Sequence, residues 1–226
     1  QSVALQAQNG LGAAFPLTPV AACHGFSMRS MTKISSGPAE VAANGAARIT
    51  TTLREDAAVI GLVGAAHGVS HFAQLLLAPL FPWLKDEFNA SYTELGLLLS
   101  IFFVTSCAVQ TLAGFVVDRV GPRPVLFGGL LLSGVAALGY ASSSSYWALM
   151  WWSVAAGAGN GVFHPADYTL LNHKVHKPRL GHAYSVHGIT GSLGWALAPA
   201  LLVPVALWQG WRVALLCAAA VAFAVL

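Results

Sequence analysis

The sequence predicts an all-α membrane protein, a bundle of six transmembrane helices with its last helix truncated. Of the 226 residues, 56% are hydrophobic and 8% are charged, whereas roughly 25% of residues in a soluble domain are charged. So few charges cannot cover a globule with polar surface. The apolar residues also fall into segments of about 20, the length that a helix needs to cross a bilayer. We therefore expect this chain in a lipid bilayer, in the cell membrane.

Six segments have the length and composition of a spanning helix. They are residues 57–84, 94–117, 124–142, 146–171, 181–207 and 211–226. The sixth opens at GWRVALLC and stops at Leu226, and the first residue is Gln1 rather than methionine, so we expect a fragment cut within a helix. Residues 1–55, rich in Ala, Gly, Ser and Thr without a sustained period, are predicted to be a disordered amino-terminal tail. Residues 56–226 are predicted to form the bundle.

Lysine and arginine recur near alternate ends of the predicted helices. They are Arg48 and Arg54 before the first helix, Arg119 and Arg123 after the second, and Lys174, Lys177 and Arg179 after the fourth. By the positive-inside rule these loops and the amino terminus face the cytoplasm of a multi-pass protein. Because the basic residues are spread loop by loop, the net charge of +3 does not predict a nucleic-acid partner.

A short charged turn joins the second and third predicted helices. The stretch GFVVDRVGPRP (114–124) places Gly114, Asp118, Arg119, Gly121 and Arg123 on the cytoplasmic rim of a tight hairpin. An aspartate beside arginines can cap a helix end and pair across a helix interface, so we expect a latch that opens when ion pairs rearrange. Topology alone is the alternative, since basic residues keep a short loop inside. That alternative accounts for the arginines but not for Asp118 or the glycine spacing.

The same stretch resembles the signature G-x-x-x-D-R-x-G-x-R of the major facilitator superfamily, with Pro122 where that family usually has a basic residue. The stretches GNGVFHPADYTLL (159–171), SVHGITGSLGWALAPAL (185–201) and GWR (210–212) agree, and FHPA is similar to the fosmidomycin-resistance-like branch. The resemblance covers residues 57–226. It implies the amino-terminal half of a twelve-helix fold, in which two six-helix bundles rock about a central cavity.

Ionisable and amide side chains inside the first predicted helix are candidate functional residues, because such groups are costly at membrane depth. His67 lies roughly 15 Å into the helix, near the middle of a core about 30 Å thick. His71 follows four residues later on the same helix face, and Gln74 lies on the same stripe. We expect this face to line a substrate or proton pathway, since histidine titrates near physiological pH. Neutral histidines bonded to neighbouring helices are the alternative for either residue alone.

A second polar group lies on the fourth predicted helix. His164 and Asp167 are three residues apart, and Asn160 precedes them by one turn. His187, on the fifth helix, lies at a similar depth, and we expect all four residues to join the same pathway. For Asp167 the favoured interpretation is instead an ion pair with a rim arginine such as Arg119 or Arg123.

These features predict a secondary active transporter of small molecules that works by alternating access, with proton-coupled export as its finer form, and not an enzyme. We expect no cofactor, no bound metal and no nucleic acid. The expected partners are a small-molecule substrate, the lipid bilayer, protons and the missing carboxy-terminal half.

A membrane metalloenzyme of the desaturase type is the competing hypothesis. Three histidine pairs have the required types, and imidazole suits iron. They are His67 with His71, His173 with His176, and His182 with His187. Depth disfavours this hypothesis, because the first pair lies near mid-membrane and the second in a cytoplasmic loop.

Overall fold

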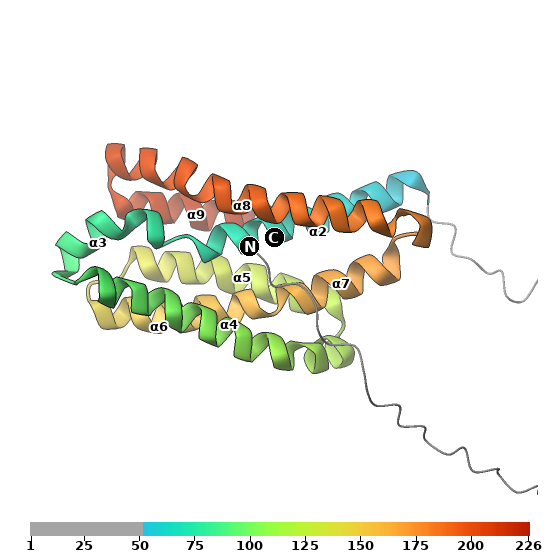
Figure 1. Cartoon of the computed structure of the whole chain (residues 1–226), viewed down its shortest axis with the longest axis horizontal. Helices are drawn as coiled ribbons and strands as arrows, with labels where there is room; N and C mark the ends of the chain where they lie inside the picture. The colour runs from blue at the N-terminus through green and yellow to red at the C-terminus, as the bar shows by residue number, and fades with distance from the viewer. Residues whose placement is uncertain (1–51) are drawn as a thin grey trace, which may run out of the picture. The chain divides into compact units, whose positions relative to one another are not determined.

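The computed structural model describes residues 52–226, and every regular element in this range is helical. The helices are α2 (Leu53–Gln74), α3 (Phe81–Phe88), α4 (Tyr92–Val120), α5 (Pro122–Ala141), α6 (Tyr146–Gly161), α7 (Phe163–Lys174), α8 (Leu180–Gln209) and α9 (Trp211–Val225). Two single turns of 3-10 helix lie between these helices: η1 (Ala78–Leu80) before α3 and η2 (Lys177–Arg179) before α8. Figure 1 shows these helices side by side in one bundle. The all-α fold class is confirmed. Of the tail predicted for residues 1–55, residues 1–51 lie outside the described residues.

Four helical stretches are long and apolar enough to cross a membrane: Leu53–Phe88, Tyr92–Val120, Pro122–Ala141 and Lys177–Gln209. Helix α9 is a shorter apolar helix. The fourth predicted span is two helices, α6 and α7, that meet at Val162. Pro165 explains this break, because it has no N–H to donate to the carbonyl of Gly161, the last residue of α6. The first predicted span is likewise interrupted after Gln74, where Pro79 cannot donate to the carbonyl of Leu75.

Local sequence fixes the helix ends. Thr52 with Glu55 and Ser91 with Glu94 form capping boxes at the starts of α2 and α4, each satisfying otherwise unpaired backbone N–H groups. A single residue, Gly121, separates α4 from α5 and has φ +93°, a conformation that glycine adopts without the penalty other residues incur. The tight hairpin predicted for the charged turn is therefore present.

Glycines bring the helices that carry the candidate residues into close contact. Helix α2 packs along α8, and α4 packs along α6. A Cβ at Gly194 of α8 would lie 2.2 Å from the carbonyl oxygen of Gly68 in α2, and one at Gly157 of α6 would lie 2.4 Å from that of Phe102 in α4. Because no side chain fits at either place, the backbones approach closely, as in other packed membrane helices.

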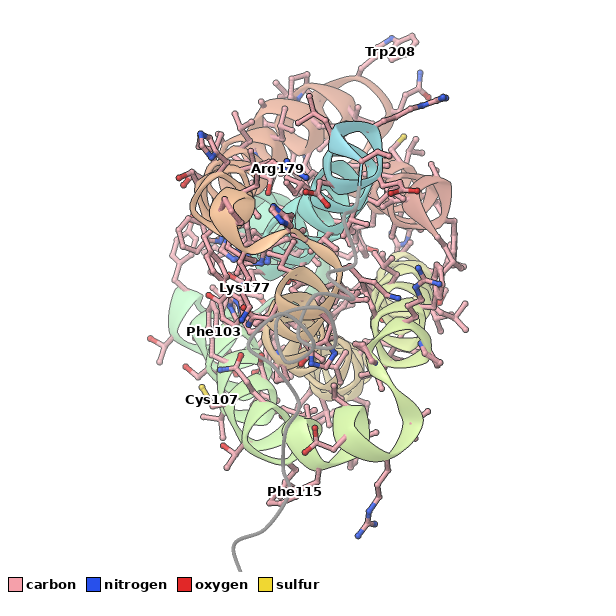
Figure 2. All side chains as sticks on the ribbon, turned by 90° about the vertical axis from the view of Figure 1, so that its right-hand side faces the viewer. Phe103, Cys107, Phe115, Lys177, Arg179 and Trp208 are labelled. Atoms are coloured by element: carbon pink, nitrogen blue, oxygen red, sulfur yellow. The ribbon has the colours of Figure 1, made fainter. Side chains whose placement is uncertain are left out.

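The outer faces of α4 and α8 are apolar and exposed. Val104, Leu112 and Phe115 on α4, and Leu207 and Trp208 on α8, are each more than 60% exposed. Figure 2 shows Phe115 and Trp208 pointing away from the bundle. Apolar faces of this extent require lipid or another apolar protein surface around them.

Candidate functional site: a buried aspartate among four histidines

Asp167 of α7 lies at the centre of the polar cluster and is fully buried. Its Oδ2 atom lies 3.2 Å from Nδ1 of His67 on α2 and 3.2 Å from Nε2 of His187 on α8. The contact with His187 has hydrogen-bond geometry, whereas Nδ1 of His67 is at ion-pair distance without hydrogen-bond alignment. One carboxylate thus joins α2 to the consecutive helices α7 and α8.

The four predicted histidines gather around this carboxylate. The rings of His67 and His187 stack with centroids 3.5 Å apart. His71 and His164 lie 4.3 Å and 5.1 Å from the ring of His67. Both nitrogens of His71, Nδ1 of His164 and Oδ1 of Asp167 are buried without a hydrogen-bond partner in the described part of the chain. The cluster therefore has unused hydrogen-bonding capacity, a costly state in an apolar bundle.

Glycine on α8 makes room for the imidazoles. A Cβ at Gly191 would lie 2.9 Å from Nε2 of His67 and 3.0 Å from two ring atoms of His71. Any larger residue at this position would displace the two rings. Gly191 thus makes room for the cluster, and sequence reasoning did not identify it.

Gln74 and Asn160 belong to a second, adjoining network. The amide of Asn160 donates to the backbone oxygen and hydroxyl of Ser70 at 3.1 Å and 2.9 Å, and its oxygen accepts from Ser106 at 2.9 Å and from Gln74 at 3.4 Å. Gln74 in turn accepts a hydrogen bond of 2.9 Å from the indole of Trp195. Helices α2, α4, α6 and α8 are linked through these groups.

The ion pair favoured for Asp167 is wrong. Its neighbours are His67 and His187, and no arginine contacts it among residues 52–226. Asp118, Arg119 and Arg123 are exposed, and no ion pair within the described range involves them. Their role as a latch stays a prediction, as does that of Gly114, where a Cβ would meet open space.

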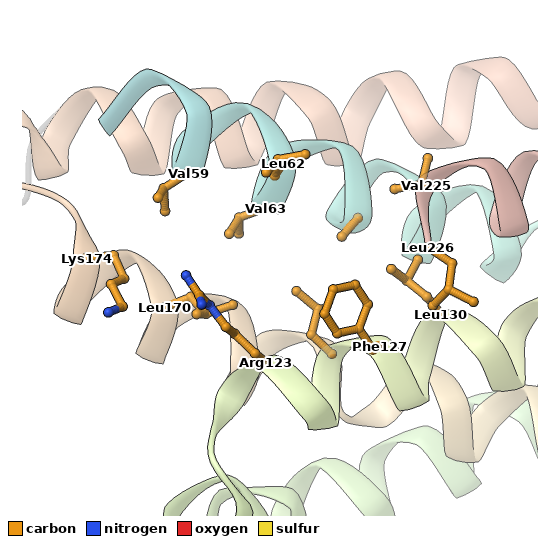
Figure 3. Close-up of a pocket in the computed structure, with 12 residues that line it drawn as sticks. Val59, Leu62, Val63, Arg123, Phe127, Leu130, Leu170, Lys174, Val225 and Leu226 are labelled. Atoms are coloured by element: carbon orange, nitrogen blue, oxygen red, sulfur yellow. The ribbon is translucent and has the colours of Figure 1, made fainter. Parts of the chain in front are cut away.

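Arg123 faces an apolar cavity rather than the histidines. The cavity, of about 330 Å³, is lined by residues of α2, α5, α7 and α9 together with the last residue of the chain. Figure 3 shows Arg123 and Lys174 together at one end of it, with Phe127 and Leu130 further along. None of the seven predicted pathway residues lines this cavity.

Sequence reasoning missed an ion pair between distant segments. The carboxylate of Asp56, near the start of α2, is 1% exposed and accepts hydrogen bonds from the side chain of Arg179 and from the backbone N–H of His176. More than 100 residues separate Asp56 from these partners, so no local pattern in the sequence marks the contact. The pair joins α2 to the turn before α8.

The histidine boxes of a metalloenzyme do not assemble. Among residues 52–226, the single grouping with metal-ligand spacing is His67, His164 and His187, whose donor atoms lie within 4.8 Å of one another. His164 belongs to none of the predicted boxes, and His173 and His182 are exposed. This arrangement does not support the desaturase hypothesis.

Comparison with known proteins also points away from a desaturase. A family model described as Major Facilitator Superfamily matches residues 63–226. Over 170 residues the chain is 29% identical to the fosmidomycin resistance protein of Escherichia coli, a match that covers 74% of this chain and 41% of that protein. It is 30% identical to the membrane sensor protein UhpC of Salmonella typhimurium over 65% of this chain and 36% of that protein.

A human relative is named for a different function. The voltage-gated purine nucleotide uniporter SLC17A9 is 27% identical over 57% of this chain and 31% of that protein. The chain thus spans between 31% and 41% of the length of these three relatives. The resemblance predicted from the charged turn and the FHPA stretch is confirmed.

Proposed function

The chain belongs to the major facilitator superfamily, and from this premise we propose that it carries out secondary active transport of a small molecule by alternating access, coupled to protons and in the direction of export. It is a multi-pass membrane protein of a transporter family rather than of an enzyme family. In the proposed arrangement the amino terminus faces the cytoplasm, and a second bundle, the carboxy-terminal half, covers apolar surface such as that of α4 and α8.

The buried cluster of Asp167, His67 and His187 is the observation that carries the proposal. A buried aspartate is costly inside a membrane bundle, by about 2.5–3.5 kcal/mol at a helix centre on insertion scales, so its presence needs a compensating role. Three titratable side chains meet at one point, where three helices come together. A proton bound there reduces the charge at the helix junction, which is how protonation can favour one arrangement of the bundle over another.

The remaining predicted residues extend this point into a pathway. His71 and His164 are half-buried and contact His67, so they offer the next positions for a proton or a polar substrate group. Gln74 continues the polar face along α2 and donates a hydrogen bond to Asn160 of α6. We assign the charged turn, Asp118 with its arginines, to the rim of the moving bundle, where its partners would come from outside residues 52–226.

Cysteine accessibility tests this function without knowledge of the substrate. In the full-length protein, the native cysteines are replaced by serine and Tyr168, which contacts His164 and His187, is replaced by cysteine. An impermeant maleimide is then applied to vesicles of either orientation at about pH 5 and about pH 8. We expect labelling from both sides in a ratio that changes with pH, and loss of that change in Asp167→Asn.

A cysteine at Trp208, 82% exposed on α8, is the control and should react from one side at either pH. Labelling of the Tyr168 position from one side only, at every pH, would contradict alternating access. A pH-dependent ratio that survives Asp167→Asn would contradict the role of the cluster. A protein that binds ligand but never changes sides would fit the sensor named among its relatives better than a transporter.

A further inference from the structure

Five rings from three helices form a continuous row beside the buried cluster. Trp195 of α8 contacts His71 of α2 with centroids 4.5 Å apart, and His71 contacts His164 of α7 at 6.1 Å. His164 stacks on Tyr168 at 5.8 Å, and Tyr168 meets Tyr184 of α8 at 5.7 Å. We name these five residues the aromatic row.

The three large rings of the aromatic row are accessible. Trp195, Tyr168 and Tyr184 are 45%, 43% and 39% exposed, and the two histidines between them are half-buried. Aromatic side chains this large normally lose most of their surface on folding, because burial of a ring is strongly favourable. The hydrogen bond from Trp195 to Gln74 holds the indole beside His71 rather than leaving it free to turn into lipid. A row that is open but held in place is suited to stacking with a ligand.

The charges around the aromatic row favour one sign of ligand. Asp167 lies directly behind it, because the two imidazoles that contact this carboxylate also contact row members: His67 lies beside His71 and His164, and His187 lies 5.3 Å from Tyr168. No lysine or arginine occurs in α8 or in α7 before Lys174, nor in α2 after Arg54. Lys174, Lys177 and Arg179 lie at the end of the bundle beyond Tyr184. Between Trp195 and Tyr168, therefore, the described residues place no lysine or arginine, whereas Asp167 can carry a negative charge.

We propose that the aromatic row between Trp195 and Tyr168 binds the organic cation that this protein transports. The faces of indole, phenol and imidazole rings attract cations through their quadrupoles, and indole does so most strongly. Asp167 adds long-range attraction in a region where the effective dielectric constant is low. This inference names the substrate class of the proposed transporter and so rests on that function.

Competition between the cation and protons follows from the same geometry. The titratable groups that face the row are His67 and His71 on α2, His164, Asp167 and Tyr168 on α7, and Tyr184 and His187 on α8. Each imidazole that takes up a proton becomes a positive charge within a few ångströms of the ligand, and protonation of Asp167 removes the attractive charge. Protons and the organic cation therefore occupy the cluster alternately, which is the requirement for exchange of one against the other.

Equilibrium binding of radiolabelled tetraphenylphosphonium to the purified full-length protein in detergent tests this inference. We expect saturable binding at about pH 8 that weakens severalfold at about pH 5. Tyr168→Ala and Trp195→Ala should each weaken it by roughly three- to tenfold, the effect of removing one ring from a cation. Tyr168→Phe keeps the ring and should retain the affinity of the unmodified protein. Trp208→Ala removes an exposed indole on the same helix outside the row, and should leave binding unchanged.

Tetraphenylborate supplies a test that needs no variant, because it has the shape of tetraphenylphosphonium and the opposite charge. Saturable binding of the cation but not of the anion supports the proposal, whereas equal binding of both overturns it. Binding that is unaffected by both alanine variants, or that is tighter in acid, also overturns it. If the cation binds as expected while the Tyr168 cysteine is labelled from one side only, the transport function fails and the binding site stands. Alternating access without cation binding overturns the binding site and leaves the transport function standing.

Discussion

Replacement of Gly194 by alanine is the substitution for which the structure gives the clearest magnitude. The new Cβ would lie 2.2 Å from the carbonyl oxygen of Gly68, whereas real Cβ atoms essentially never approach within 3.0 Å of another heavy atom. Helices α2 and α8 must therefore separate by about 0.8 Å, the difference between 3.0 Å and 2.2 Å, and a backbone atom cannot rotate away. Overpacking of this kind costs roughly 1–3 kcal/mol.

Gly188 provides the matched control on the same helix. A Cβ there meets nothing within 4 Å, so Gly188→Ala adds a residue of higher helix propensity at no steric cost. We expect the midpoint of thermal unfolding in detergent to fall by roughly 2–10 °C for Gly194→Ala and to stay constant or rise for Gly188→Ala. Equal midpoints for the two variants would refute the close approach of α2 and α8. Because His67 and His71 flank Gly68, separation of the helices should also weaken tetraphenylphosphonium binding in Gly194→Ala alone.

Three further substitutions test contacts in other parts of the bundle. Asp56→Asn should lower the unfolding midpoint, since it removes the charge from a buried group that pairs with an arginine, whereas Asp118→Asn, at an exposed site, should not. Asn160→Ala leaves the hydroxyls of Ser70 and Ser106 without their amide partner, and we expect a loss of about 1–3 kcal/mol in the free energy of unfolding. Gly121→Ala imposes φ +93° on a residue with a Cβ and should cost about 1–2 kcal/mol, whereas Gly114→Ala, in open space, should be neutral or stabilising. Unfolding of each purified variant by guanidinium or heat is the measurement. A destabilising substitution that leaves the stability of the protein unchanged would contradict the contact that it removes.

Length and apolar composition predicted α4, α5 and α8 well, because a spanning helix satisfies its own backbone and needs only a continuous apolar run. The breaks after Gln74 and at Val162 were not predicted, although Pro79 and Pro165 lie within a few residues of them. A proline inside an apolar segment is compatible with either a continuous kinked helix or two helices. Helix α8 illustrates the first outcome, because it runs without interruption through Pro199 and Pro204. Tertiary packing decides between the two outcomes, and local sequence does not report it.

For the site, spacing along one helix was informative and contacts between helices were not. The intervals of four residues from His67 to His71 and three from His164 to Asp167 fixed which side chains share a face. The partner of Asp167 was misassigned because the choice between a histidine of α2 and an arginine of the charged turn depends on how α7 is placed against both. The same limitation hid the contact of Asp56 with Arg179.

The break between α6 and α7 also bears on how the cluster could move. His164 and Asp167 lie in the first turns of α7, directly after Val162, while Asn160 ends the adjoining network on α6. A displacement of α7 relative to α6 would therefore change the contacts of Asp167 with His67 and His187 and leave those of Asn160 with Ser70 and Ser106 in place. Because Pro165 already prevents one backbone hydrogen bond across the junction, such a displacement breaks fewer bonds than bending a continuous helix would. The proposed proton binding at Asp167 would therefore act beside a helix junction where Pro165 already removes one backbone hydrogen bond.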